Sequence, residues 1–178
     1  MRKLRVEELN RLSVEAFREA PKLPLVCVLD NIRSMHNVGS VFRTADAFRL
    51  DKLYLCGITP HPPHREIRKT AIGAEYSVAW EGYSHTLELV KELKNLGWVL
   101  VAAEQTSNSV PLPEWKLDTQ RKYALILGHE IEGVAQEVLD QCDLAVEIPQ
   151  HGTKHSLNIS VAAGICLYHM YAHLSPFS

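Results

Sequence analysis

Apolar runs of strand length alternate with stretches of helical periodicity along most of the chain. The first run, Leu25 to Leu29, is continuously apolar, which is typical of a strand that is covered on both faces. Turn residues and polar segments separate the later runs from one another. The runs that we interpret as further strands are Leu53 to Cys56, Tyr76 to Trp80, Trp98 to Ala103, Tyr123 to Leu127 and Leu144 to Ile148.

Periodic apolar positions predict helices between these strands. An amphipathic helix is predicted over Val6 to Ala20, where Pro21 ends it, and Gly97 closes a helix over Thr86 to Leu96. The remaining predicted helices are Val38 to Phe48, Val134 to Leu139 and Ile159 to Leu174.

The alternation of strands and helices predicts an α/β fold, with a mostly parallel sheet and helices on both faces. Polar connections follow several strands, and the longest runs from Glu104 to Lys122. Loops of that length in compact domains are usually functional. The sequence contains no internal repeat and no domain boundary, so we predict one domain over residues 1–178, in which residues 1–20 form an N-terminal helical extension.

The composition narrows the class of protein without identifying it. Hydrophobic residues make up 46% of the 178 residues and charged residues 22%, and no segment is long and apolar enough to span a bilayer. The first residues, MRKLRVEELNRLSVEAF, lack the apolar core of a signal peptide, so we expect a cytoplasmic protein. A net charge of -2 neither requires nor excludes a nucleic-acid partner.

The cysteines and histidines indicate neither a disulfide framework nor a metal site. The cysteines are far apart and form no CxxC motif, and three of the four sit inside apolar runs, as buried thiols would in a reducing compartment. The histidine pairs His151 with His155 and His169 with His173 are each four residues apart, but neither pair has an acidic or thiol partner beside it. We therefore expect no metal site.

Common signatures of nucleotide-binding and hydrolytic sites are missing from the sequence. No GxGxxG motif follows the first strand, and no GxSxG nucleophile elbow is found. The segment GHEIEG has the glycine spacing of a phosphate-binding loop, but Val134 and Ala135 stand where that loop needs Lys and Ser or Thr. An enzyme that uses another nucleotide through these motifs is therefore disfavoured.

Polar clusters follow the predicted strands where each strand ends. Asn37 and Arg43 come after the first strand, and their spacing of six residues predicts that they lie near each other. Glu130 follows the strand YALIL, while Ser156 and Asn158 follow the strand LAVEI. Because parallel strands bring their carboxyl ends to one edge of a sheet, we expect these clusters to meet there.

Each cluster also has an ordinary structural interpretation. Arg43 could form a surface ion pair with Asp46, Glu130 could cap the helix after it, and Ser156 and Asn158 could be helix caps. Taken singly these interpretations are favoured. The coincidence of three clusters at strand ends favours a shared site instead.

Three segments of the chain resemble the motifs of the SpoU (TrmH) family of RNA ribose 2′-O-methyltransferases, in the SPOUT superfamily. They are NVGSVFRTADAF at Asn37 to Phe48, LILGHEIEGV at Leu125 to Val134, and IPQHGTKHSLNISVAAGICLY at Ile148 to Tyr168. The resemblance covers most of Leu25 to Leu174. It implies that the C-terminal part of the sheet fold is threaded into a deep trefoil knot, that S-adenosylmethionine binds in the knot, and that the chain forms a homodimer.

The resemblance also implies a role for each matching residue. Two departures concern the cofactor pocket, because His129 stands where Asn or Ser is usual and Gln150 where Met is common. The implied catalytic residues are Asn37, Arg43, Glu130, Ser156 and Asn158. The implied cofactor-binding residues are Ala103, Gly128, His129, Ile148 and Leu157.

The reaction implied by the resemblance is attack of a ribose 2′-hydroxyl on a sulfonium methyl group. An unperturbed guanidinium holds its proton too firmly to act as a base near neutral pH. We therefore hypothesise that Arg43 mainly binds the adjacent phosphate and stabilises the developing alkoxide.

RNA is the expected partner, and the basic residues after the second strand are the expected contacts. These residues are His64, Arg65, Arg68 and Lys69, with His61 beside them. The basic residues of the first helix are interrupted by glutamates, so we interpret that face as solvated. Because no RNA-capturing domain precedes Leu25, we expect tRNA rather than rRNA as the target. The alternative is a catalytically inactive RNA-binding protein of the same fold.

Overall fold

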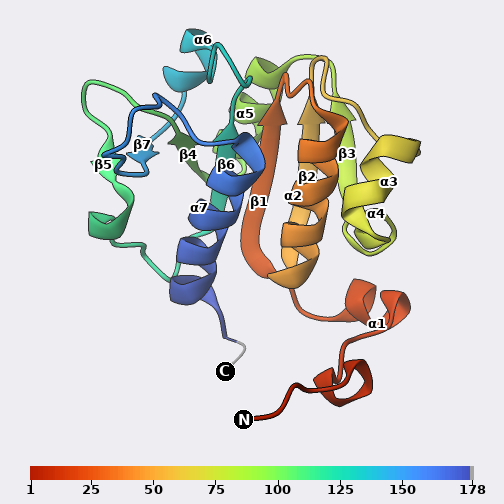
Figure 1. Ribbon diagram of the computed structural model, residues 1–178. Helices are drawn as coiled ribbons and strands as arrows, with labels where there is room; N and C mark the ends of the chain where they lie inside the picture. The colour runs from red at the N-terminus through yellow and green to blue at the C-terminus, as the bar shows by residue number, and fades with distance from the viewer. Residues whose placement is uncertain (177–178) are drawn as a thin grey trace.

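A seven-stranded sheet forms the centre of the protein in the computed structural model, which describes residues 1–176 (Figure 1). Neighbouring strands are parallel throughout the order β3-β2-β1-β6-β4-β7-β5, which confirms the predicted parallel sheet. The strands are β1 (Leu23–Asp30), β2 (Leu50–Cys56), β3 (Trp80–Tyr83), β4 (Val99–Ala103), β5 (Val110–Pro111), β6 (Tyr123–Leu127) and β7 (Leu144–Glu147).

Helices cover both faces of this sheet, as the sequence predicted (Figure 1). One hydrophobic core lies under α2, α3 and α7, and a second, smaller core lies under α5 and α6. The helices are α1 (Val14–Glu19), α2 (Met35–Ala47), α3 (Arg65–Ala71), α4 (Ala74–Ser77), α5 (Thr86–Asn95), α6 (Gln136–Leu139) and α7 (Ile159–Leu174), with short 3-10 helices η1 (Val6–Leu9) and η2 (Leu112–Glu114).

The continuous apolar run of β1 follows from its central place in the sheet. Leu25, Cys27 and Leu29 belong to the core under α2, whereas Val26 and Val28 belong to the core under α5. Successive side chains of a strand point to opposite faces, so a strand that is covered on both faces needs apolar residues at every position. The same division into two cores is seen along β6.

The strand order places several strand ends side by side. From β1 the chain moves outward through β2 and β3, and it then crosses to the other side of β1, where β6 separates β1 from β4. Such a change of direction opens a crevice at the carboxyl ends of parallel strands, where open α/β sheets bind ligands. The loops after β1, β4, β6 and β7 begin at this edge.

The N-terminal extension differs from the predicted continuous helix. The structure has the short helices η1 and α1, separated at Asn10, which has a left-handed backbone with φ 48. Ser13 then caps α1 by accepting a hydrogen bond from the backbone N–H of Ala16 at 3.1 Å. Leu9 and Leu12 are exposed, and Phe17 reaches the core. An isolated short helix is marginal in water, so this segment is helical only in part.

Two other local predictions were wrong. Residues 76–80 are not a strand, because α4 ends at Ser77 and β3 begins only at Trp80. The Ser77 hydroxyl donates a hydrogen bond to the Asp46 carboxylate, which ties α4 to α2. The polar connection after β2 was predicted as a loop, but its basic part is helix α3. The long connection after β4 also contains β5 and η2.

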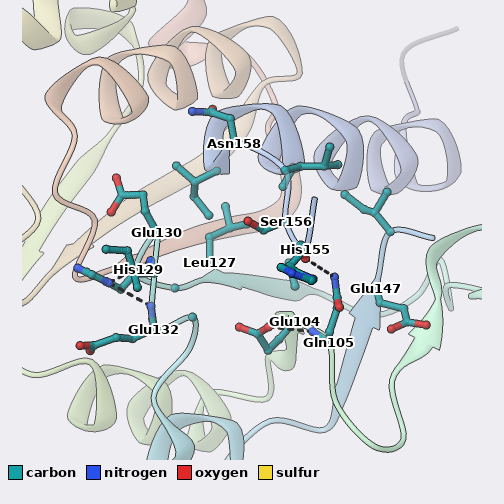
Figure 2. Close-up of a pocket in the computed structure, with 18 of the residues that line it drawn as sticks. Glu104, Gln105, Leu127, His129, Glu130, Glu132, Glu147, His155, Ser156 and Asn158 are labelled. Carbon is teal, nitrogen blue, oxygen red and sulfur yellow. Dashed lines mark hydrogen bonds between the residues drawn. The ribbon is translucent and has the colours of Figure 1, made fainter. Parts of the chain in front are cut away.

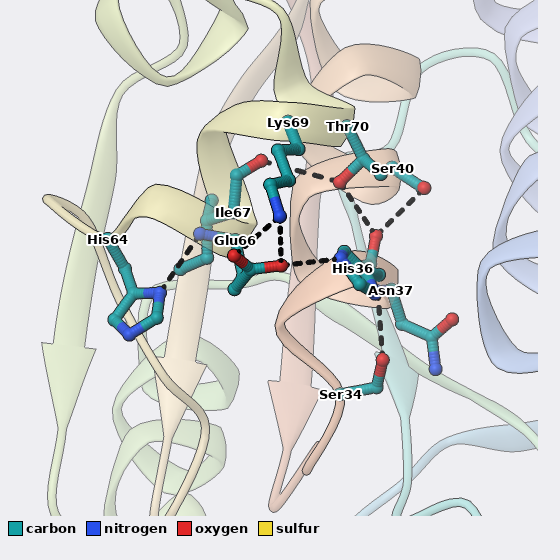
Figure 3. Close-up of polar contacts among 9 residues, drawn as sticks. All are labelled: Ser34, His36, Asn37, Ser40, His64, Glu66, Ile67, Lys69 and Thr70. Carbon is teal, nitrogen blue, oxygen red and sulfur yellow. Dashed lines mark hydrogen bonds and ion pairs between the residues drawn. The ribbon is translucent and has the colours of Figure 1, made fainter.

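Helices α2 and α3 approach each other closely at Gly39. A Cβ atom at this position would collide with the carbonyl oxygen of Ile67 and with the Thr70 hydroxyl, so only glycine allows the contact. The Thr70 hydroxyl donates a hydrogen bond to the carbonyl oxygen of His36 at 2.9 Å (Figure 3). This contact fixes α3 beside the start of α2.

The cysteines are free thiols, as expected from their spacing. Cys27, Cys56 and Cys166 are buried, and burial raises the pKa of Cys56 and of Cys166 to about 12.

Within residues 1–176, no helix combines the length and the apolar character needed to cross a membrane.

Candidate functional site

A cavity of about 500 Å³ lies at the carboxyl edge of the sheet (Figure 2). Its walls come from residues 103–105 at the end of β4 and just after it, and from residues 127–133 at the end of β6 and in the turn that follows. The other walls are residues 146–148 and Gln150 at the end of β7, and residues 155–159 and Ala162 at the start of α7. The residues implied as cofactor-binding all line this cavity; they are Ala103, Gly128, His129, Ile148 and Leu157.

The segment after β6 forms a tight turn that depends on glycine. The backbone N–H groups of His129 and Gly133 each donate a hydrogen bond to the other residue's carbonyl oxygen, at 3.0 and 2.9 Å. A Cβ atom at Gly128 would collide with the backbone of Gly133, and Gly133 has a φ of 71. The His129 side chain supports the same turn, because its Nδ1 atom accepts the N–H groups of Ile131 and Glu132 at 3.2 Å.

The Glu130 carboxylate connects this turn to the start of α2. It accepts hydrogen bonds from the backbone N–H groups of Arg33 at 3.0 Å and Ser34 at 3.1 Å. The side-chain amide of Asn37 donates to the same carboxylate at 3.1 Å. Glu130 therefore does not cap the helix after it but binds the turn that precedes α2.

Asn37 extends the connection to α7. The Asn158 side-chain amide donates to Oδ1 of Asn37 at 3.2 Å. Asn158 is also the N-cap of α7, because its Oδ1 accepts the backbone N–H of Ser160 at 2.9 Å. The interpretation of Asn158 as a helix cap and its placement in the shared cluster are both correct. Glu130, Asn37 and Asn158 thus join three separate segments of the chain.

Hydrogen bonding sets the ionisation of Glu130. Partial burial raises the pKa of its carboxyl. The hydrogen bonds donated by the N–H groups of Arg33 and Ser34 and by the Asn37 amide lower the pKa by a larger amount. The net result is a pKa below the ordinary value of 4.5, so Glu130 carries its charge at neutral pH.

Arg43 lies apart from this cluster. It stands six positions after Asn37 in α2, which corresponds to about 9 Å along the helix and a different side of it. Arg43 is exposed and lines a second hollow of about 500 Å³ between α2 and α3, together with Ser40, Lys69, Thr70 and neighbouring residues. The spacing of six residues therefore did not place Arg43 beside Asn37 within one chain. Asp46, its expected ion-pair partner, instead accepts a hydrogen bond from Ser77.

Ser156 lines the cavity and is exposed, in the loop that leads to α7. Several other residues line the cavity but were not predicted from the sequence; they are Glu104, Gln105, Glu132, Glu147 and His155. Glu104 and Gln105 directly follow β4. The rule that drew attention to polar residues at strand ends would have found these two as well.

The residues predicted to contact RNA lie on α3. His64 caps this helix by accepting the backbone N–H of Glu66 at 3.2 Å, and Arg65 is exposed. The Arg68 guanidinium lies 6.0 Å from the centre of the Tyr76 ring. The Lys69 ammonium is 2.7 Å from the Glu66 carboxylate, which also contacts Nε2 of His36 at 3.0 Å (Figure 3).

Two basic residues of the N-terminal extension, Arg2 and Arg18, make contacts within the protein. The Arg2 guanidinium pairs with the Glu8 carboxylate at 2.6 Å, and the Arg18 guanidinium donates to the carbonyl oxygen of Tyr76.

His169 stacks on Trp115, with ring centres 6.0 Å apart. In the described part of the chain, no three His, Cys, Asp or Glu side chains are grouped as metal ligands.

Comparison with known proteins adds independent information. Residues 24–168 match the model of the SpoU rRNA Methylase family. The tRNA (guanosine(18)-2′-O)-methyltransferase of Aquifex aeolicus is 32% identical over 81% of this chain and 67% of that protein. The 23S rRNA (guanosine-2′-O-)-methyltransferase RlmB of Nitrosomonas europaea is 31% identical over 83% of this chain and 55% of that protein. The chain spans 55 to 65% of the length of the first curated relatives that it matches.

Solved structures share the fold. The A. aeolicus TrmH/SpoU tRNA modifying enzyme superposes with a TM-score of 0.79 at 28% identity, covering 90% of this chain and 81% of that chain. The AdoMet-bound rRNA methyltransferase of Sinorhizobium meliloti also has a TM-score of 0.79, at 27% identity over 89% of this chain and 60% of that chain.

The hydrogen bonds to Glu130 predict a pH-dependent contribution to stability. At neutral pH we expect Glu130→Gln to lower the free energy of unfolding by about 1–2 kcal/mol, because a charged acceptor is replaced by a neutral one. The folded-state pKa lies below the unfolded value of 4.5. The difference between the two proteins is therefore fully present above pH 4.5 and is lost as the pH falls through the folded-state pKa.

Urea unfolding of both proteins across a pH series measures this difference. The matched control is Glu137→Gln, which removes an exposed carboxylate on α6. A stability gap for Glu130→Gln that stays constant into strong acid would contradict the assignment.

Proposed function

We propose that this chain, which belongs to the SpoU rRNA Methylase family, transfers a methyl group from S-adenosylmethionine to a ribose 2′-hydroxyl of RNA. The observation that carries the proposal is the hydrogen-bonded chain from Glu130 through Asn37 to Asn158, of which Glu130 and Asn158 line the cavity. It joins all three motif segments at one place. Relatives named for tRNA and for 23S rRNA both match the chain, and we propose tRNA as the target because the chain covers 67% of the relative named for tRNA and 55% of the relative named for 23S rRNA.

The cavity suits a cofactor of the proposed size. Its volume of about 500 Å³ lies within the range of small-molecule sites, about 300–1,000 Å³. Gly128 and Gly133 are in close contact at the cavity wall. Because neither has a side chain, their backbone groups line the cavity directly. Ala103, Gly128, His129, Ile148 and Leu157 would hold S-adenosylmethionine, which supplies an electrophilic sulfonium methyl group when bound.

We also propose that the C-terminal segment is threaded as a deep trefoil knot. The connection after β4 contacts the C-terminal segment at two distant points. Gln105 donates a hydrogen bond to the carbonyl oxygen of His155, and Trp115 stacks on His169. A connection that touches both the start and the far part of this segment supports a loop through which the segment passes. The knot would bring two loops together around the cavity.

The role that we propose for Arg43 is electrostatic. Its guanidinium would bind the phosphate next to the target ribose and stabilise the oxygen as the 2′-hydroxyl gains the methyl group and passes its proton to solvent water. Asn37, Glu130, Ser156 and Asn158 would orient the reacting groups at the cavity. A group that stabilises charge on the reacting oxygen accelerates the reaction most when it is already held in position before the reaction.

A homodimer would explain why Arg43 lies outside its own cavity. Val161, Ile165 and Tyr168 form an apolar stripe along α7, and they are 50%, 39% and 60% exposed. Tyr168 contacts Phe48, with ring centres 5.9 Å apart, and Phe48 lines the same hollow as Arg43. Helices α2 and α7 lie side by side on one face of the sheet (Figure 1). A partner docked on this stripe would therefore receive Arg43, which we propose acts in the partner's cavity.

The proposed role of Arg43 predicts a loss of chemistry without a loss of cofactor. We expect Arg43→Ala to reduce methyl transfer by about 100-fold or more, as removal of one stabilising donor commonly does. Binding of S-adenosylmethionine, measured by calorimetry, should be nearly unchanged, because the proposed contacts of Arg43 are to the RNA phosphate and the 2′-oxygen and not to the cofactor, and Arg43 does not line the cavity of its own chain. Unchanged methyl transfer would remove Arg43 from the mechanism.

Mixed dimers separate action within one chain from action across the dimer. Arg43→Ala chains and Asn158→Ala chains, each inactive alone, are produced together. If Arg43 serves its partner, one intact site forms in each mixed dimer, and about a quarter of wild-type activity returns. Action within one chain restores none.

RNA binding would use the exposed face of α3. Arg65 is exposed on this helix, and the Arg68 side chain lies over Tyr76. The helix is fixed beside α2 through Gly39 and Thr70, so these cations are held near the hollow that contains Arg43. This arrangement supports contact with phosphates on either side of the target nucleotide.

The reduced thiols agree with the proposed cytoplasmic location.

The α3 proposal predicts a salt-dependent effect. Replacing Arg65 and Arg68 by Gln should weaken RNA binding, and each lost phosphate contact should reduce the slope of log affinity against log salt by about 0.7–1. The matched control is Arg2→Gln, because Arg2 already pairs with Glu8. An unchanged slope in the α3 double variant would place the RNA elsewhere.

A further inference from the structure

Two consecutive residues after β4, Glu104 and Gln105, contact both loops that enclose the cavity. The Glu104 carboxylate accepts the backbone N–H of Val134 at 3.0 Å, at the end of the turn that carries Glu130. The Gln105 side-chain amide donates to the carbonyl oxygen of His155 at 3.2 Å, in the loop that carries Ser156. We refer to Glu104 and Gln105 as the β4 clasp.

Several independent contacts show that the structure is fitted to a carboxylate at position 104. Its second oxygen accepts the backbone N–H of Gln105 at 2.9 Å, which fixes the orientation of the side chain. A Cβ atom at Gly133 would collide with the carboxylate, so glycine is needed for the side chain to reach Val134. Gly133 in turn packs against Gly128. The carboxylate, the turn and the end of β6 therefore fit together as one closely packed unit.

The contacts of Glu104 require a carboxylate, so replacing it by an amide of the same shape should weaken them. Both partners of its carboxylate are N–H donors, namely the amides of Val134 and Gln105. Hydrogen bonds to an ionised acceptor are about twice as strong as neutral ones. A glutamine side chain has the same shape but only one acceptor oxygen, and its NH₂ group would face an N–H donor. Glu104→Gln therefore removes one contact without removing volume.

We infer that Glu104 and Gln105 are positioning residues, which hold the two cavity loops at the separation that the cofactor requires. Neither residue needs to touch the reacting atoms for this role. The inference rests on the proposed function only for the identity of the cofactor, because the contacts to the two loops are present in the protein itself. Loss of the clasp should weaken cofactor binding more than the chemical step.

The decisive comparison is between Glu104→Gln and wild type. We expect the Kd for S-adenosylmethionine, measured by calorimetry, to rise about tenfold, which is the difference between a charged and a neutral hydrogen bond. The rate of methyl transfer at saturating cofactor should stay within about twofold, because the groups at the ribose are unchanged. Gln105→Ala, at an exposed position, should give a smaller rise in Kd and no loss of folding.

Hydrogen exchange provides a readout that does not depend on the cofactor. In Glu104→Gln the Val134 amide should exchange faster, because its acceptor is weakened, while the amides of β6 keep their protection. The matched control is Glu137→Gln, an exposed carboxylate on α6, in which Val134 exchange and cofactor affinity should equal those of wild type.

The outcomes separate this inference from the proposed function. A wild-type protein that does not bind S-adenosylmethionine contradicts the proposed function, and the Val134 exchange rate then decides the inference alone. A Glu104→Gln protein with wild-type affinity, or with unchanged Val134 exchange, overturns the inference. Equal losses of saturated rate and affinity would also overturn it, because they would indicate general damage rather than positioning.

Discussion

The hydrogen bonds of the Glu130 carboxylate are the interaction on which the candidate site depends. They bring the turn after β6 against the segment before α2, and the contact between Asn37 and Asn158 extends this link to α7. Without this carboxylate, the part-buried amides of Ser34 and Asn37 would lose their acceptor, and donors that are left unsatisfied away from water are costly. Residues that are 93 to 121 positions apart in the sequence are therefore held at one place.

The parallel sheet makes this meeting possible. Strands β1, β6, β4 and β7 are neighbours, so the loops at their carboxyl ends all begin at the same edge. Small residues allow the loops to approach, since Gly128 and Gly133 touch through their backbones and Gly39 lets α3 contact α2. The polar side chains then set the distances between loops. The fold therefore brings the loops close together, and a small number of carboxylate and amide contacts fix their relative positions.

Local patterns in the sequence predicted those parts of the structure in which local forces dominate. Helix α7 has the predicted bounds, because its apolar residues and the Asn158 cap both mark it. The central strands were found because burial on both faces requires continuous apolar runs. The helical turn of α4 was missed because it depends on a tertiary contact, that of Ser77 with Asp46. The break at Asn10 was missed because the apolar periodicity of residues 6–20 gives no sign of its left-handed backbone. The meeting of Asn37, Glu130 and Asn158 was predicted from strand ends, whereas the position of Arg43 needed the helical rotation along α2.

The most direct test of the proposed activity is to incubate the protein with methyl-labelled S-adenosylmethionine and RNA and then to hydrolyse the RNA with alkali. Alkaline cleavage needs a free 2′-hydroxyl, so a 2′-O-methyl group protects the bond beside it. We predict that the label appears in alkali-resistant dinucleotides. Label in mononucleotides, which would indicate methylation of a base, or the absence of any transferred label would contradict it.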